Sequence, residues 1–335
     1  MKGDGFDLDM ASIFARPDLY LHDIDVVNMR AEFIRMSRDG YAGAWASEMP
    51  LFAPQGTATT VDIAEIGTFL ESRQPPVRRL HFIFHTGHAG SLRIARLLGT
   101  ADGLFPLREP PAVRLLSWES RFLGTARARV TGAEWRRLRE IVLRLSGRTW
   151  NATDTALIRT NSHCTRIMRP LLDWYPGSRA ILLHVGLQRF LRTMLQPNRR
   201  AEIARYVSDL FYYDLQRILG DARPRIDSLP QSKRTALVWL IHMHEFGRLM
   251  MESNYSARVL LVDFDNFLDQ RERMIGDICG FLGVPRAGRA LAAEPDLGAI
   301  DDGDEVTLHP VMRAEIYDAM QWAAVMRSRM AGSTG

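Results

Sequence analysis

The sequence predicts an α/β fold in which a short parallel sheet is flanked by helices. From about residue 78 onward, short apolar runs alternate with stretches of helical spacing. These runs are apolar nearly throughout, which is typical of parallel strands that are buried on both faces. With 46% hydrophobic residues, the 335-residue chain can also bury a sizeable core. The expected strands are Leu80–His85, Gly103–Leu107, Thr155–Thr160, Arg179–His184 and Arg258–Asp263.

Helical patterns fill the intervals between these strands. Apolar residues recur there at the three- and four-residue spacing of one helix face. A last helix, Pro310 to Met330, is expected after an acidic loop at 301–305. The other expected helices span residues 91–99, 110–123, 132–146, 164–174 and 232–252.

The first 77 residues are expected to form a helical segment that packs on a core domain of residues 78–335. Asp23 to Met36 carries apolar residues at roughly helical spacing, with an aspartate as the start signal. Thr60 or Asp62 is expected to cap a short helix that runs to Glu71. The pair Pro75-Pro76 then ends it.

Composition bounds the possible functions. The formal charge of +4 is modest, and nucleic-acid binding is not expected. Cys164 and Cys279 lie far apart, so neither a disulfide framework nor a metal site is predicted. No apolar run is long enough to cross a bilayer, and the first residues do not resemble a signal peptide. We therefore expect a cytoplasmic protein without a membrane span, whereas its oligomeric state is not predicted.

The strand Leu80–His85 leads into a turn of small residues, Thr86-Gly87-His88-Ala89-Gly90-Ser91, and then into a helix. Such a turn exposes backbone N–H groups at a helix N-terminus, where the partial positive charge favours a phosphate or sulfate. Ser91 adds a hydroxyl to these amides. An ordinary tight turn is the alternative reading, and the flanking strand and helix favour the anion site.

Hydrolysis of ATP or GTP is not expected from this loop. The nucleoside-triphosphate loop G-x-x-x-x-G-K-[ST] uses a lysine on the β and γ phosphates. Here the loop is shorter and has no lysine. Of the chain's 43 basic residues, only Lys2 and Lys233 are lysines.

The loop resembles that of the sulfotransferases, the P-loop family that uses 3′-phosphoadenosine 5′-phosphosulfate (PAPS). Their first motif is approximately P-K-S-G-T-T-W-L. In the alignment, Gly87 takes the proline place and His88 the lysine place, and Leu92 replaces the second threonine. Further segments resemble the family in order, and together they cover roughly residues 78 to 285. They are Leu104–Leu116, Ala156–Ser162, Arg179–Leu195 and Arg258–Pro285.

The resemblance implies a three-layer P-loop NTPase-like fold, PAPS as donor and no metal. It implies that Gly87, His88, Ala89, Gly90, Ser91 and Leu92 bind the phosphosulfate. His88 would stabilise the charge on the leaving phosphate, as the family's lysine does. An exposed loop histidine is the alternative.

Glu109 is the candidate general base that takes the proton of the acceptor. The alternative is a carboxylate that merely favours the start of the helix at Pro111. Arg108 is a contact to the substrate or to a phosphate, or simply the ion-pair partner of Glu109. His163 is a reserve candidate for the base.

Thr193 matches the family's serine for the 3′-phosphate of the cofactor. The arginine of that motif is Val185 here, which removes a bidentate phosphate ligand. Arg189 or Arg192 could substitute for it, or both could be solvated helix residues.

These features predict a sulfotransferase-like transferase that moves a sulfuryl group to a hydroxyl or amine. The acceptor would be a small molecule, a glycan or a peptide. It would bind among residues 20–55 and 199–235, where Phe211, Tyr212, Tyr213 and Trp239 suggest an aromatic wall. A non-catalytic anion- or nucleotide-binding protein of the same fold is the main alternative. An ATP-dependent phosphotransferase is the weaker one.

Overall fold

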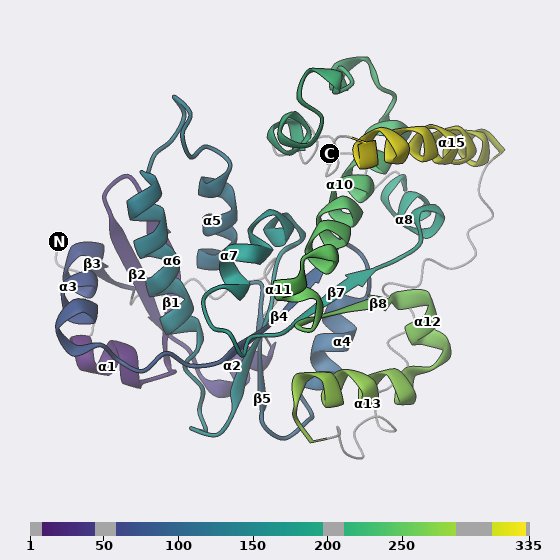
Figure 1. Cartoon of the computed structure of the whole chain (residues 1–335). Helices are drawn as coiled ribbons and strands as arrows, with labels where there is room; N and C mark the ends of the chain where they lie inside the picture. Colours follow the sequence, from purple (N-terminus) through teal and green to yellow (C-terminus); the bar gives the residue numbers. More distant parts are fainter. Residues whose placement is uncertain (1–8, 44–57, 197–210, 286–309, 333–335) are drawn as a thin grey trace. The chain divides into compact units, whose positions relative to one another are not determined.

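A computed structural model describes residues 9–43, 58–196, 211–285 and 310–332 of the chain (Figure 1). Its centre is a five-stranded parallel sheet flanked by helices, so the predicted α/β class is confirmed. The strand order is β5-β6-β4-β7-β8. The strands are β4 (Leu80–His85), β5 (Leu104–Arg108), β6 (Thr155–Arg159), β7 (Ala180–His184) and β8 (Val259–Asp263).

The sheet forms where the sequence is apolar on both faces of a strand. All six residues of β4 are buried, including His81 and the last residue, His85. β4 and β5 both pair in parallel with β6, and Arg108 lies opposite Arg159 in the β5–β6 register. Because all strands run in parallel, the residues that follow them gather at the carboxyl edge, where ligands of such sheets bind.

The chain divides into two compact units. Unit 1 comprises residues 1–84, 91–181 and 272–291, and unit 2 comprises residues 85–90, 182–271 and 292–335. The loop after β4 thus belongs to unit 2 together with the last strand residue, His85, whereas residues 80–84 of β4 and the next helix belong to unit 1. The two-domain division at residue 77 stays a prediction.

Unit 1 holds the helices that follow β4, β5 and β6. In α4 (Ser91–Leu98), the side chains of Ile94, Leu97 and Leu98 are buried, and this helix packs on β5 and β6. Thr131 caps α6 (Gly132–Ser146) in a reciprocal capping box with Glu134. The other elements here are α5 (Pro111–Ser120), η2 (Ser162–Ile167), α7 (Met168–Leu172) and α13 (Arg271–Leu282). The first residue of α13, Arg271, still belongs to the 182–271 stretch of unit 2.

Unit 2 is built around α10 (Gln231–Met251), which packs against α8 (Leu187–Met194) and α15 (Pro310–Gly332) (Figure 1). The buried face of α10 carries Leu237, Trp239 and Leu240. The expected helices 232–252 and 310–330 are confirmed to within two residues. The other elements of unit 2 are η3 (Gly220–Ala222), η4 (Ile226–Ser228), α11 (Ser253–Ser256) and α12 (Phe264–Asp269).

The expectation of a helical N-terminal segment is wrong for residues 19–25, 30–35 and 59–62, which form strands. A three-stranded antiparallel sheet lies there, made of β1 (Leu19–Asp25), β2 (Arg30–Arg35) and β3 (Thr59–Asp62). Three helices accompany it: α1 (Met10–Ala15), α2 (Arg38–Gly43) and α3 (Ile63–Arg73). Only α3 corresponds to a helix that the sequence predicted.

The hairpin turn explains why the segment 23–36 is not helical. The Asp25 carboxylate accepts hydrogen bonds from the backbone N–H groups of Val27 and Asn28, which closes a turn. Met29 then adopts a left-handed conformation with φ of 51°. Val27, counted as part of an apolar helix face, is 74% exposed in this turn.

Arg148, which follows α6, links the end of this helix to α1 and β1. Its buried guanidinium donates hydrogen bonds to the backbone carbonyls of Ile13, Arg16 and Leu19. Burial lowers the pKa of Arg148 to about 10. The contact shows that the N-terminal segment packs on the same unit as β4, β5 and β6.

Two further points concern the acidic loop and a possible membrane span. The acidic loop 301–305 falls outside the described residues. In the described parts of the chain, no helix combines the length and the apolar composition that crossing a bilayer requires.

Candidate oxyanion site

The loop after β4 has a backbone suited to close approach by an anion. Gly87, His88 and Gly90 all have positive φ values of 89°, 46° and 64°. Successive amides in such a conformation point toward a common concavity and bind anions. The α4 helix starts at once with Ser91, so the loop also lies at a helix N-terminus.

Part of the loop is held by the chain itself. The backbone N–H of Gly87 donates to Nδ1 of His85 at 3.1 Å, so this amide is engaged. The N–H of Thr86 donates to the carbonyl of Leu183 on the neighbouring strand at 3.1 Å. In contrast, the buried hydroxyl Oγ1 of Thr86 has no hydrogen-bond partner among the described residues. A buried hydroxyl of this kind is costly without a partner, which fits a loop that has a polar ligand or water beside it.

An aromatic ring covers one end of the loop. A Cβ atom on Gly90 would collide with the ring of Phe264, the first residue of α12. The guanidinium of Arg189 lies over the same ring, 5.8 Å from its centroid. Gly90 and Arg189, both predicted to bind the cofactor, therefore meet a common side chain that the sequence did not single out.

Arg189 is engaged by a carboxylate. Its Nη1 donates to Oδ1 of Asp265 at 2.6 Å, with the two side chains 34% and 43% exposed. The other oxygen of Asp265 faces Gly186, at 3.8 Å from the place of a Cβ there. A phosphate on Arg189 would therefore meet the negative charge of Asp265. Thr193, the other residue predicted for the 3′-phosphate, is half-buried in the last turn of α8, and its role stays a prediction.

At position 185, the arginine of the family is replaced by a residue that belongs to the packed interior. The residue is 1% exposed, and its carbonyl accepts the indole N–H of Trp239 at 2.8 Å. Trp239 is thus a packing residue, as is the buried Phe211. Of the predicted aromatic wall, Tyr212 is 38% exposed and lines a cavity of about 790 Å³ together with Arg223 and Arg225.

In unit 1, a chain of polar contacts joins the first residue of α4 to the candidate base. Arg159, at the end of β6, donates from Nε to the hydroxyl of Ser91 at 2.9 Å. The same guanidinium donates from Nη1 to Oε1 of Glu109 at 2.6 Å. Asn161 donates from Nδ2 to Oε2 of Glu109 at 3.2 Å. Ser91 and Glu109, predicted separately, are therefore linked through Arg159.

The carboxylate of Glu109 does not cap the helix that follows it. The α5 helix has no acidic residue in its first turn, and its N-cap Pro110 makes no side-chain cap. Glu109 has a φ of 44°, which is strained for a residue with a side chain, and its N–H donates to the carbonyl of Arg159. Such strain is concentrated at functional sites in general. The role of Glu109 as the base stays a prediction.

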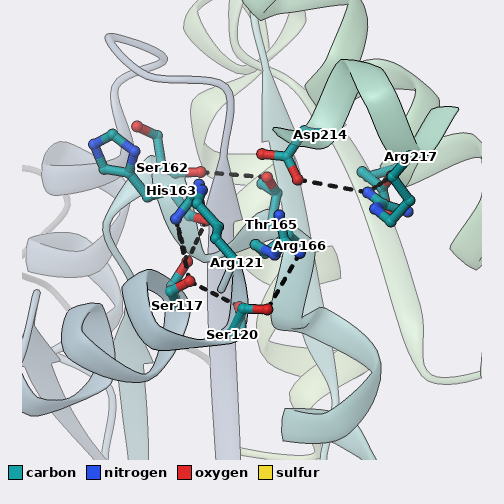
Figure 2. A network of polar contacts seen from close by, with 10 residues as sticks. Ser117, Ser120, Arg121, Ser162, His163, Thr165, Arg166, Asp214 and Arg217 are labelled. Atoms are coloured by element: carbon teal, nitrogen blue, oxygen red, sulfur yellow. Dashed lines mark hydrogen bonds and ion pairs between the residues drawn. The ribbon is translucent and has the colours of Figure 1, made fainter. Parts of the chain in front are cut away.

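A buried network fixes the elements that carry Glu109 and Asn161 (Figure 2). Ser117 of α5 donates its hydroxyl to the carbonyl of His163 at 2.6 Å. Arg121, only 4% exposed, donates to the carbonyl of Ser117 at 3.1 Å and to that of His163 at 3.5 Å. Because α5 follows Glu109 and η2 follows Asn161, this network joins the two elements next to these residues. The carbonyl of His163 therefore has a structural part in the network. The residue as a whole is 9% exposed.

Three important residues escaped the sequence analysis: Arg159, Asn161 and Phe264. Arg159 and Asn161 lie in the segment Ala156–Ser162, and neither side chain was given a role from the sequence. Their place at the carboxyl end of a predicted central strand was the signal that could have selected them. Phe264 carried no such signal, because its contact with Gly90 joins residues that are remote in the sequence.

No group of three or more histidine, cysteine, aspartate or glutamate side chains that could hold a metal occurs in the described residues.

Comparisons with known proteins give only distant structural likenesses. No family model matches the chain, and no curated protein matches it. Three solved structures that resemble the fold are sulfotransferases. The sulfotransferase domain from the curacin biosynthetic pathway is 12% identical with a TM-score of 0.40, and 62% of this chain matches 75% of that one. The sulfotransferase domain of the Synechococcus PCC 7002 olefin synthase is 13% identical with a TM-score of 0.40. The match covers 74% of this chain and 94% of that one.

The third is the sulfotransferase from Alicyclobacillus acidocaldarius, 14% identical with a TM-score of 0.42 over 76% of this chain and 97% of that chain. At this level of similarity, no conclusion about activity follows.

Proposed function

We propose that the protein is a sulfotransferase that takes a sulfuryl group from PAPS or a related phosphosulfate nucleotide. The observation that carries the proposal is the loop 85–91, where three residues of positive φ lead into the start of α4. The sequence segments from 78 to 285 that resemble the family support the same reading. The acceptor group would be a hydroxyl or an amine.

The residues of the loop fit the phosphosulfate part of such a donor. Its phosphate and sulfate oxygens would accept hydrogen bonds from amides of His88 to Ser91, and the unpartnered Thr86 hydroxyl lies in the same loop. When bound, the donor supplies an electrophilic sulfur with nucleoside phosphate as its leaving group. His88 would donate to the oxygen on which charge develops.

Glu109 would take the acceptor proton. Its carboxylate is held by Arg159 and Asn161, one on each oxygen, which fixes the direction of its remaining lone pairs. Acid–base assistance by a positioned carboxylate contributes about 10²–10⁴-fold in rate. Arg159 in turn contacts Ser91, so the base is tied to the end of the anion loop.

The fit to the 3′-phosphate of PAPS is poorer. Arg189 is paired with Asp265, and Val185 stands where the family has an arginine. This observation favours a second candidate function, a protein that binds an oxyanion or nucleotide without transferring sulfate. We place the phosphotransferase alternative last, because the loop has no lysine for ATP phosphates.

The test combines binding and turnover. PAPS and its desulfated product, adenosine 3′,5′-bisphosphate (PAP), are titrated into the protein, and sulfate transfer is followed with a panel of hydroxyl and amine acceptors. Binding with transfer supports the enzyme, and binding without transfer supports the second candidate. Absence of heat and of any thermal shift at millimolar ligand would defeat both.

The variant His88→Lys separates an active enzyme from a decayed one. Lysine carries a full charge at neutral pH, whereas an imidazole is a weaker and pH-dependent cation. A gain of transfer would show that the wild-type loop has lost a catalytic group. A loss of transfer would show that His88 is adapted to its own reaction.

A further inference from the structure

Arg108 and Arg159 lie directly opposite each other in the parallel register of β5 and β6. Residues at such paired positions point to the same face of the sheet, and like charges placed there destabilise it. Arg159 has a carboxylate partner, because it donates to Glu109. The sequence reading that Arg108 is the partner of Glu109 is therefore not what the contacts show.

Arg108 has surroundings that favour an anion. Its side chain is half-buried, and within the described residues its buried Nε donates to no acceptor. Burial, followed by the nearby charges of Arg96 and Arg159, lowers the pKa of Arg108 to about 10. A guanidinium in this position gains stability from any oxyanion that can reach it, because two parallel N–H donors match two oxygens.

Arg108 and Arg159 lie where a parallel sheet is expected to bind a ligand. Both arginines end their strands at the carboxyl edge of the sheet. Arg108 immediately precedes Glu109, the candidate base, in the sequence. Arg159, which lies opposite Arg108, donates to the Glu109 carboxylate. A group bound between the two arginines would therefore lie near the place where an acceptor must present its proton.

We propose that Arg108 and Arg159 form a second oxyanion site, which binds a sulfate, phosphate or carboxylate group carried by the acceptor. This inference rests on the proposed function for the identity of the ligand as an acceptor. It makes the acceptor an anionic molecule rather than a neutral phenol, alcohol or amine. The anion would bridge the two guanidinium groups and reduce their mutual repulsion.

The experiment titrates inorganic sulfate into the full chain by calorimetry, with and without saturating PAP. The variant is Arg108→Gln, and the matched control is Arg114→Gln, which removes an exposed arginine from α5. With PAP present, we expect sulfate to bind the wild type and the control, and to bind Arg108→Gln at least tenfold more weakly. PAP itself should bind all three proteins alike.

Two results would overturn the proposal. Sulfate that binds Arg108→Gln as tightly as it binds the wild type would show that no site exists there. Sulfate binding that PAP abolishes in the wild type, with PAP binding weakened in Arg108→Gln, would show that the arginines hold the donor instead. If no protein binds PAP, the proposed function fails, and the sulfate titration without PAP still tests the arginine site.

Thermal unfolding without ligand guards against misfolding of the variant. Because Arg108 has an unsatisfied buried donor, its replacement by glutamine should leave the melting temperature unchanged or raise it. Sulfate should stabilise the wild type and not the variant. A lower melting temperature together with an undiminished stabilisation by sulfate would assign Arg108 a structural role and overturn the site. Arg108→Lys, which keeps the charge without the planar fork, should bind sulfate with intermediate affinity.

Discussion

Phe264 lies against Gly90 so closely that the loop has no room for a side chain at that position. The ring belongs to the start of α12, directly after the last strand of the sheet. The contact therefore fixes one end of the candidate anion loop by packing. It also explains why glycine is needed there for two separate reasons, its φ of 64° and the ring above it.

Gly90→Ala should destabilise the protein by about 2–4 kcal/mol, because it adds a steric collision to a strained φ. Gly124→Ala is the matched control, since Gly124 has a φ of 76° and nothing within 4 Å of its Cβ position. The control should lose only about 1 kcal/mol. Urea unfolding measures both values. Equal losses in the two variants would contradict the packing of Phe264 on the loop.

Glu109→Gln should reduce sulfate transfer by about 10²–10⁴-fold while PAP binding is kept, because the base is lost and the anion loop is intact. The control is Glu65→Gln, an exposed residue of α3. Steady-state kinetics with PAPS as the varied substrate measures the effect on turnover separately from that on KM. If the rate survives in Glu109→Gln, another group acts as the base.

Asp265→Asn should raise the affinity for PAP relative to AMP, by about three- to tenfold, because it removes a negative charge beside Arg189. The amide has the same shape as the carboxylate. Asp269→Asn, on the exposed side of the same helix, controls for the change in net charge. Competition titration with the two nucleotides gives the ratio. An unchanged ratio would mean that the 3′-phosphate does not reach Arg189.

Stability should fall as the pH falls from about 6.5 to 4, because of His81. This histidine is buried in β4, and burial, with Arg79 and Arg179 nearby, lowers its pKa to about 4. Its Nδ1 also accepts the N–H of Arg179 at 3.1 Å. In this window, the unfolded chain binds a proton that the folded chain does not, so the stability is complete above pH 6.5.

The loss corresponds to about 3 kcal/mol over the whole window. Urea unfolding of the wild type and of His81→Gln at a series of pH values tests this prediction. The variant is expected to be less stable at neutral pH but to vary less between pH 6.5 and 4. A wild type whose stability is flat across that range would show that His81 takes up a proton in the folded state.

The sequence predicted the central sheet well because its strands are buried on both faces and therefore apolar at every position. All five strands and most of the helices around them are confirmed within the described residues. The segment 23–36 was mistaken for a helix because its apolar residues fit both periodicities. Its fold is decided by the Asp25 turn and by pairing with β3, which is remote in sequence.

The site was predictable only where its chemistry is local in sequence. The loop Gly87–Ser91 is a continuous motif, and its positive φ values agree with the glycines. The link from Ser91 to Glu109 passes through Arg159, and the cover over Gly90 comes from Phe264. These contacts depend on strand order and on packing, which no local pattern carries.

The central claim is that the loop amides of His88 to Ser91 bind the oxyanion of a nucleotide donor. Amide chemical shifts of the loop during a PAP titration, measured by transverse-relaxation-optimised NMR, test it most directly. The account predicts that the largest shift changes fall on His88 to Ser91 and saturate with a single site. Loop amides that stay unchanged while PAP binds elsewhere, or while PAP does not bind at all, would contradict it.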